Sequence, residues 1–176
     1  LLDQLGFPPE SITDVVLTHG DFDHAGGVVR YPRAIIHLQR ATAKRIAQTP
    51  GLAATRRYLV EAEAEGRLNW VDQSYRLTGE LTIEHIGGHT QGSQVVHLSQ
   101  DERRYVFVGD ECYLREACLT GQPLPPRAVA SPPRNRAFLE RLSNKGPAGA
   151  DVVLTCHDPV VLHENPTLAP GVVQIR

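Results

Sequence analysis

Short apolar runs, bounded by polar residues, glycine or proline, recur along the chain, and their length favours strands. Seven such runs are predicted as strands: residues 12–18, 33–38, 68–71, 81–86, 94–98, 104–108 and 151–155. Three stretches between them have helical character: residues 39–48, 52–66 and 132–144. This alternation of elements predicts one α/β domain over residues 1–176.

Proline sets the boundaries of one later segment. Residues 121–133 hold five prolines and are predicted to form an extended surface loop. Pro132 suits the first turn of the helix that follows, and Ser131 is its predicted N-cap.

Composition and charge narrow the classes of partner. The 176 residues are 41% hydrophobic and carry a formal net charge of −2, which gives no electrostatic reason to expect a nucleic acid or an anionic membrane. No stretch approaches the roughly 20 apolar residues of a membrane span, and the first residues lack a secretory pattern. We therefore expect a cytoplasmic protein with neither nucleic acid nor membrane as partner.

The three cysteines, Cys112, Cys118 and Cys156, are odd in number and form no CxxC pair. A disulfide framework is therefore not expected, and a reducing compartment fits the pattern better. We expect all three to be small buried side chains rather than reactive thiols.

A cluster of metal-binding side chains follows the first predicted strand. His19, Asp21, Asp23 and His24 lie within six residues. In an extended segment, residues 19, 21 and 23 project to one side, and a turn after Phe22 brings His24 toward a neighbouring point. Without a cation the crowded carboxylates would repel each other. The cluster therefore predicts two metal ions a few ångströms apart.

Three further candidates lie at the ends of later predicted strands. His89 stands in a glycine-rich turn, Asp110 follows residues 104–108, and His157 follows residues 151–155. An isolated residue of this kind is more often structural, and an isolated Asp is often a turn residue. On α/β scaffolds, however, side chains at separate strand ends commonly meet in one cleft. Their recurrence therefore indicates a metal site.

These motifs resemble those of the metallo-β-lactamase superfamily. Residues 18–27 read Thr-His-Gly-Asp-Phe-Asp-His-Ala-Gly-Gly and resemble its THxHxDHxGG signature, and residues 88–93 resemble its GHTxGS motif. Gly109-Asp110 resembles its bridging aspartate, and Cys156-His157-Asp158 its last histidine. The resemblance covers nearly the whole chain and implies an αββα sandwich, with two metal ions at one edge of its two sheets.

The resemblance also implies roles for these residues. Metal coordination lowers the pKa of water toward about 7, so a metal-bound hydroxide would be the nucleophile. Asp23 is expected to orient this hydroxide and to handle a proton, which makes it the candidate catalytic residue. The implied ligands are His19, Asp21 and His89 for the first metal, Asp23, His24 and His157 for the second, and Asp110 as the bridge.

Two features depart from the family pattern. The first is Asp21, which stands where family members usually carry His. Zn is the metal expected first, but a carboxylate is a harder ligand than imidazole and favours Fe or Mn. Asp21 could instead leave the first metal site weak. The chain also contains no Met and lacks about two strands and a helix that precede the signature in the family. We therefore expect an N-terminally incomplete sandwich, which a homo-oligomer would complete at an open sheet edge.

Three functions follow from the resemblance. The first is a metal-dependent hydrolase acting on a small ester, thioester, lactone or amide. The alternatives are an iron-dependent oxidoreductase on the same fold, favoured by Asp21, and a non-catalytic truncated homologue. The sequence leaves open whether Tyr113, Arg115 and residues 121–133 line the substrate pocket or form ordinary surface connections.

Overall fold

The computed structural model describes residues 2–144 and 151–175 and divides into two halves, each built on one sheet. The N-terminal half holds a parallel sheet in the order β1-β2-β3, formed by Asp14–Val16, Ile35–Gln39 and Leu68–Val71. The C-terminal half holds a sheet in the order β4-β5-β6-β7-β8. Its strands are Tyr75–Arg76, Leu81–His85, Gln94–Gln100, Arg103–Phe107 and Val152–Leu154. They are antiparallel except for the parallel pair β7 and β8.

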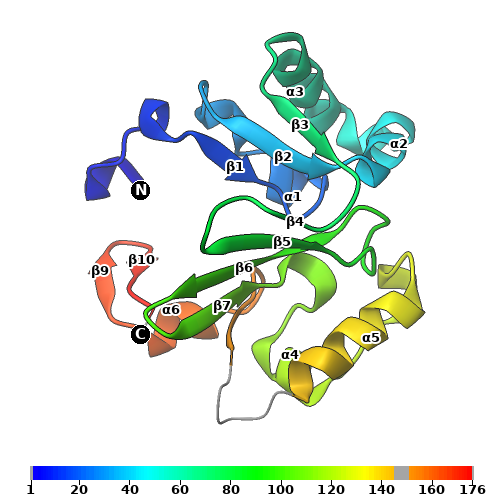
Figure 1. Cartoon of the computed structure of the whole chain (residues 1–176), viewed down its shortest axis with the longest axis vertical. Helices are drawn as coiled ribbons and strands as arrows, with labels where there is room; N and C mark the ends of the chain where they lie inside the picture. Colours follow the sequence, from blue (N-terminus) through cyan, green and yellow to red (C-terminus); the bar gives the residue numbers. More distant parts are fainter. Residues whose placement is uncertain (1, 145–150, 176) are drawn as a thin grey trace.

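Three helices pack with the N-terminal sheet, and the first of them is drawn nearest the C-terminal half (Figure 1). They are α1 (Phe22–Ala25), α2 (Ala41–Gln48) and α3 (Ala53–Ala64). β2 is the central strand and is almost fully buried, as a strand covered on both faces requires. Its residues Ile36 and Leu38 pack with Ile46 of α2 and Leu59 of α3 in one apolar cluster.

The C-terminal sheet is covered in the same way by α4 (Arg115–Thr120) and α5 (Pro132–Ser143). Val95, Val106 and Val153 of the sheet pack against Phe138 and Leu139 of α5 in a second cluster. The chain then ends with α6 (Val160–Glu164) and the hairpin of β9 (Thr167–Ala169) and β10 (Val172–Val173). Helix, sheet, sheet and helix give the predicted αββα sandwich.

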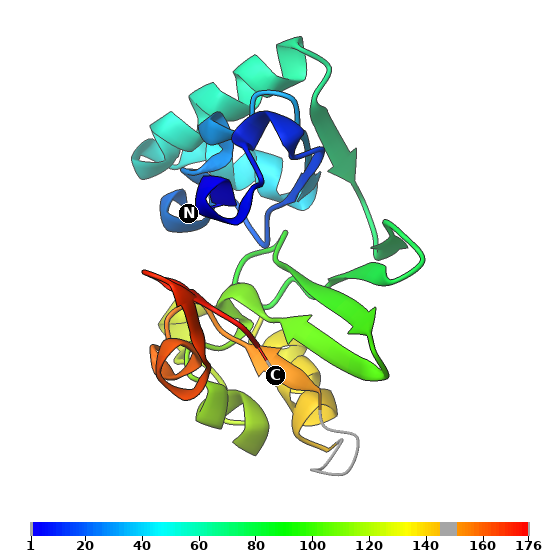
Figure 2. The same ribbon diagram turned by 90° about the vertical axis from the view of Figure 1, so that its left-hand side faces the viewer.

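A buried polar contact joins the two halves, which lie one above the other in Figure 2. The side chain of Gln94, at the start of β6, donates to the carbonyl of Leu17 at 2.7 Å. It accepts from the side chain of Gln39 in β2 at 2.8 Å, and its backbone N–H donates to Thr18 at 2.8 Å. The end of β1 is thereby held against the start of β6.

Every predicted strand and helix has a counterpart in the structure, with boundaries shifted by a few residues. Ser131 is at the N-cap position of α5, but its side chain makes no capping hydrogen bond. The predicted loop at residues 121–133 contains the 3₁₀ turn η6 (Pro126–Ala128). Within the described residues, β1 pairs only with β2, so the pairing of this edge with a second copy stays a prediction.

The expectations for the cysteines were partly wrong. Cys112 and Cys118 are buried, as predicted, but they form a disulfide with their Cα atoms 5.8 Å apart, and Cys156 is exposed. The backbone turn before α4 brings Cys118 back onto Cys112, a contact that cysteine spacing does not reveal. Since disulfides are rare in reducing compartments, the argument for such a compartment loses its basis. No helix in the described part of the chain has the length and apolar character to span a membrane.

Candidate metal centre

The side chains predicted as ligands converge where the two halves of the molecule meet. They lie in the segments that follow the strands β1, β5, β7 and β8, where the backbone leaves a sheet. The segments that carry them are the stretch after β1 (His19 and Asp21), α1 (Asp23 and His24), the turn between β5 and β6 (His89), the 3₁₀ turn η5 (Gly109–Glu111, with Asp110) and the stretch after β8 (His157).

A glycine turns the chain from β7 into η5. Gly109 has φ +53°, and a Cβ atom there would lie 2.7 Å from the Cβ atom of Thr18. Only glycine tolerates both the left-handed backbone and this close approach. The turn places Asp110 beside the residues that follow β1.

Two groups of side chains have ligand atoms within 4.8 Å of one another: His19, His89 and Asp110 in the first group, and Asp23, His24 and His157 in the second group. In the first, Oδ2 of Asp110 lies 3.9 Å from Nε2 of His19 and 3.6 Å from Nε2 of His89. Oδ1 of Asp110 faces the second group and lies 3.1 Å from Nε2 of both His24 and His157. Asp110 therefore offers one oxygen to each group, as a bridging carboxylate would.

The buried atoms at this centre fit a cation. Nε2 of His19, His24 and His89 and Oδ1 of Asp110 are buried and make no hydrogen bond of acceptable geometry. Buried polar atoms in proteins almost always have a partner. Imidazole nitrogens and carboxylates are also the ligands that Zn²⁺ prefers. A divalent ion in each group would satisfy these atoms.

Burial and the carboxylates set the protonation of the histidines. Burial lowers the pKa of His19 to about 4, and the nearby His24 acts in the same direction. Burial also opposes the protonation of His24, but its contacts with Asp110 and Cys156 outweigh burial and raise its pKa to about 10. A proton on His24 thus takes the place that a cation would occupy, so metal binding must release it.

Asp21 lies at the edge of the first group and is bound to an arginine. Its Oδ2 is 3.7 Å from Nε2 of both His19 and His89. Its oxygens accept three hydrogen bonds of 2.9 to 3.0 Å from Nε and Nη2 of Arg45 in α2. Burial raises the pKa of Asp21, but His89 and Arg45 outweigh it and hold the carboxyl ionised. Arg45 therefore neutralises the charge that Asp21 brings to the site.

Sequence reasoning missed Glu111, which supports His89. This side chain is fully buried, and its Oε1 accepts the backbone N–H groups of Gly88 and His89 at 3.0 and 3.1 Å. Its Oε2 accepts Nδ2 of Asn135 at 2.9 Å. Nδ1 of His89 donates to the carbonyl of Ala128 at 2.7 Å, which turns Nε2 toward the centre.

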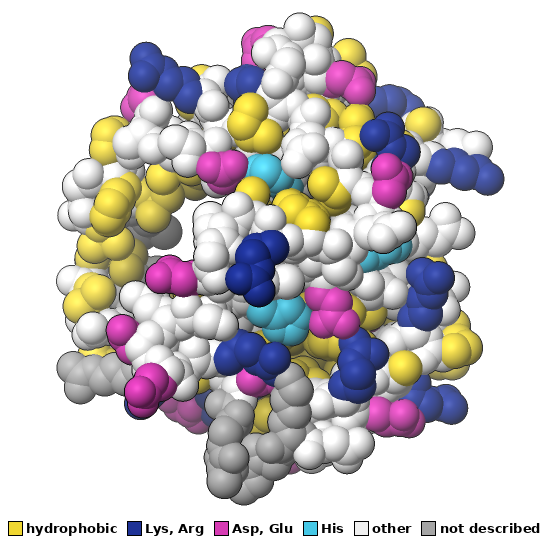
Figure 3. Space-filling view, in the orientation of Figure 1, with side chains coloured by type: hydrophobic (Ala, Val, Ile, Leu, Met, Phe, Trp, Pro, Cys, Tyr) yellow, Lys and Arg dark blue, Asp and Glu magenta, His cyan; other side chains and the backbone are white. Residues whose placement is uncertain are grey.

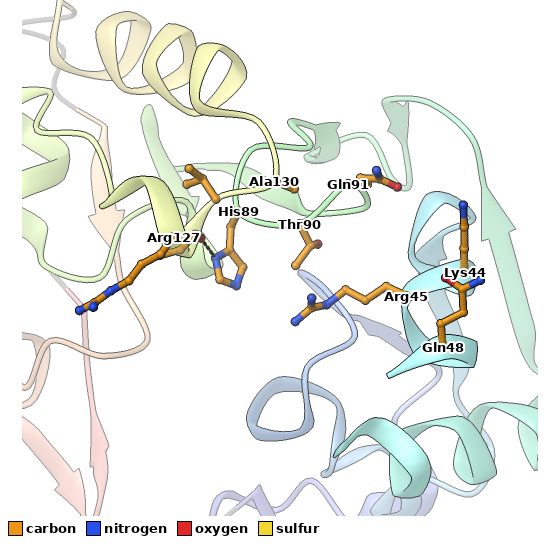
Figure 4. A pocket seen from close by; sticks show the side chains of 10 residues that line it. Lys44, Arg45, Gln48, His89, Thr90, Gln91, Arg127 and Ala130 are labelled. Carbon is orange, nitrogen blue, oxygen red and sulfur yellow. Dashed lines mark hydrogen bonds between the residues drawn. The ribbon is translucent and has the colours of Figure 1, made fainter. Parts of the chain in front are cut away.

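An open cleft of about 410 Å³ adjoins His89 (Figure 4). Residues 127–130 line it, so part of the loop whose role was open belongs to this cleft. The ring of Tyr113 lies edge-on to His157 at 5.5 Å, beside the centre. Arg115 instead pairs with Glu164 at 2.6 Å and lines a different hollow. The cleft is lined by Lys44, Arg45, Gln48, His89, Thr90, Gln91, Arg127, Ala128, Val129 and Ala130.

An αββα sandwich with two groups of His and Asp side chains that share one carboxylate defines a class of metal-binding α/β proteins. Comparison with known proteins agrees: the family model described as metallo-beta-lactamase superfamily matches residues 1–157. The chain belongs to this superfamily. A probable metallo-hydrolase of Mycobacterium tuberculosis is 29% identical over 134 residues, covering 65% of this chain and 41% of that protein. The chain thus spans about two-fifths of the length of the curated relatives it matches.

Solved structures share the fold. An N-acyl homoserine lactone hydrolase, with N-hexanoyl-L-homoserine as product at its catalytic metal centre, has a TM-score of 0.73 at 17% identity. The match covers 95% of this chain and 64% of that chain. A probable metal-dependent hydrolase from Staphylococcus aureus gives 0.73 at 19% identity, covering 89% of this chain and 58% of that chain.

Proposed function

We propose that the protein is a metal-dependent hydrolase of a small ester, thioester, lactone or amide, with two divalent ions as cofactors. The observation that carries this proposal is the placement of Asp110, which presents one oxygen to each of two histidine groups. Family membership supports it, and the relatives in Mycobacterium are described as metallo-hydrolases. The lactone hydrolase of the same fold supports lactones as one class of probe.

In this proposal, His19, His89 and Asp110 hold one ion with Asp21 at its edge, and Asp23, His24 and His157 hold the other. When bound, the ions lower the pKa of water toward about 7 and polarise the carbonyl that is attacked. Glu111 and the Ala128 carbonyl keep His89 in place. Asp23 lies beside the second group, with its Oδ2 3.4 Å from Nε2 of His24 and 3.8 Å from Nε2 of His157, and from there it would take a proton from the attacking water and return it to the leaving group.

Zinc is the metal proposed first. Asp21 favoured iron or manganese at the first position because a carboxylate is harder and more negative than an imidazole. Arg45 removes the added charge, which weakens that argument and the oxidoreductase alternative that depends on it.

The experiment is a metal analysis combined with hydrolysis assays. The full chain is loaded with Zn, Mn or Fe(II), its bound metal is measured, and 4-nitrophenyl acetate, a thioester, an acyl homoserine lactone and an amide are offered. We expect two ions per chain and hydrolysis of at least one probe. Two bound ions without hydrolysis of any probe would contradict the proposal. Bound iron with oxygen consumption would replace it with the oxidoreductase.

Two substitutions test the centre itself. His89→Ala and Asp110→Ala should each lower kcat/KM by a factor on the order of 10² or more, since each removes a contact to the ions that stabilise the transition state. Circular dichroism should stay close to that of the parent protein. The matched control is His163→Ala, an exposed histidine of α6 outside both groups. Full activity in either test variant would contradict the assignment of His89 and Asp110 to the metal centre.

A further inference from the structure

The cleft beside the candidate metal centre has an excess of positive charge. Three of its ten lining residues are cationic, namely Lys44, Arg45 and Arg127, and none is acidic. The whole chain, in contrast, has a formal net charge of −2. On the face shown in Figure 3, Lys and Arg are interspersed with Asp and Glu. The excess is therefore a local feature of this cleft.

Two of the three cations are free to bind a ligand. Arg45 is committed to Asp21 through three hydrogen bonds, so this pair is neutral. Lys44 and Arg127 are exposed, and neither has a hydrogen-bond or ion-pair partner among residues 2–144 and 151–175. An anion entering the cleft would meet them without displacing an existing ion pair.

The free cations lie on opposite sides of His89, a candidate metal ligand (Figure 4). Lys44 extends from α2 on one side of the cleft, and Arg127 extends from η6 on the other (Figure 4). The guanidinium of Arg127 is turned away from Lys44 in this view, and no described residue holds it there. His89 lies between the two sides, hydrogen-bonded to Ala128, the residue that follows Arg127. Ala128, Val129 and Ala130 add an apolar strip to the cleft.

We propose that this cleft binds the anionic end of the substrate. The substrate would carry a carboxylate or phosphate group, joined through a short apolar segment to the acyl group that is hydrolysed. Arg127 can bind such a group through two parallel hydrogen bonds, and Lys44 adds a point charge. Both cations also attract an anion from solution toward the metals. The substrate class rests on the proposed hydrolase function, whereas the anion site does not.

The first test compares two esters with the same leaving group. 4-Nitrophenyl butyrate is neutral, and the mono-4-nitrophenyl ester of glutaric acid has a carboxylate at its far end. The metal-loaded full chain should have the higher kcat/KM for the anionic ester. Arg127→Gln and Lys44→Gln should each lower the ratio of the two kcat/KM values by about threefold to tenfold, mainly through KM. About 0.5 M NaCl should lower the ratio in the parent protein, because salt screens exposed charges.

The matched control is Arg103→Gln, which removes an exposed cation at the start of β7, the end of that strand away from Asp110. It should leave the ratio unchanged. A ratio that is the same in the parent protein, Arg127→Gln and Lys44→Gln would overturn the proposed substrate class.

The second test separates this site from the hydrolase proposal. Isothermal titration measures the binding of glutarate and of propyl phosphate to the metal-loaded protein, with no turnover required. Any direct contact of these anions with the metals is common to all variants, so the loss of affinity in Arg127→Gln and Lys44→Gln reports the cleft. We expect a loss of about threefold to tenfold, and the anion that loses more identifies the preferred group. Equal affinity in the parent protein and both variants would overturn the anion site, whether or not any ester is hydrolysed.

Discussion

Asp21 shows how one residue can depart from a family pattern without changing the charge of its site. Replacing a neutral imidazole by a carboxylate adds one negative charge next to the first group. Arg45 adds one positive charge and binds both oxygens of that carboxylate. Oδ2 of Asp21 still faces His19 and His89, each at 3.7 Å. The Asp21–Arg45 pair therefore has the same net charge, zero, as the neutral imidazole that it replaces.

Removing Arg45 should strengthen metal binding at the first group. In Arg45→Gln, Asp21 keeps its negative charge and loses its partner, and a cation that repels the metal is gone. The affinity for Zn²⁺ or Mn²⁺ should rise by roughly tenfold, since a charge a few ångströms away in a partly exposed site contributes about 1 kcal/mol or more. Competition with a chromophoric chelator measures this. Arg45→Lys keeps the charge and should stay near the parent value; weaker binding in Arg45→Gln would show instead that orientation of Asp21 dominates.

Sequence could indicate the candidate ligands but not the residues that support them. His89 and Asp110 could be picked out because each comes shortly after an apolar run and next to glycine, which is a local signal. Arg45 is 24 residues from Asp21 and lies on an amphipathic helix, where an exposed arginine is ordinary. Glu111 resembles any charged residue in a turn, and its burial arises only when Asn135 and the turn at Gly88 pack around it. Such roles depend on tertiary contacts.

At the scale of elements, the pattern of hydrophobic and polar residues located the helices and strands that are long or strongly apolar. β6 and α5 have seven and twelve residues and were located to within about two residues. β4 and β10 have two residues each, too few for an alternation to show, and the helix α4 has only six, too few for a helical period to show. Their backbone is held by neighbours, as α4 is by the disulfide of Cys118 and by its packing on α5. Local sequence therefore could not predict them.

One polar contact between elements should make stability depend on pH. Glu84 in β5 accepts from His97 in β6 at 2.9 Å and from Arg141 in α5 at 2.6 Å. The hydrogen bond from His97 lowers the pKa of Glu84 below its usual 4.5, against an opposing effect of burial. Because the folded pKa is the lower one, this stabilisation is complete above pH 4.5 and is lost as the pH falls through the folded value.

Glu84→Gln should therefore destabilise the protein at neutral pH and matter less in acid. We expect the free energy of unfolding to fall by about 1 kcal/mol at pH 7 and by less near about pH 3. The value at pH 7 is kept this small because the Glu84 side chain is one-third exposed. Urea unfolding at both pH values measures it. The control is Glu61→Gln on the exposed face of α3, which should shift little at either pH. A difference that grows on acidification would contradict the sign.

At the scale of the whole molecule, the candidate metal centre joins two separately packed halves. The apolar clusters of the two halves share no residue, and Gln94 supplies the buried polar contact between them. Each group of candidate ligands draws on both halves: His19 with His89 and Asp110, and Asp23 and His24 with His157. An ion held in either group would cross-link the halves, which the unfolded chain cannot reproduce.

Metal binding should consequently raise the unfolding temperature. An ion at about 100 times its Kd stabilises the folded state by about 2.7 kcal/mol, and each kcal/mol corresponds to about 2–4 °C in a chain of this size. Calorimetry with chelator and then with Zn²⁺ should show a rise of at least about 5 °C that grows with zinc concentration. Asp110→Ala should lose most of this rise because both groups lose a ligand atom.

Gln94→Ala is the control for a general loss of stability. It should lower the unfolding temperature without metal, since it leaves Gln39 and the Leu17 carbonyl without this buried partner. Zn²⁺ should still raise the unfolding temperature of this variant. If Zn²⁺ raised the unfolding temperature of Asp110→Ala as much as that of the parent protein, zinc would be binding elsewhere. Ions held in the two groups depend on Asp110, because its carboxylate faces both.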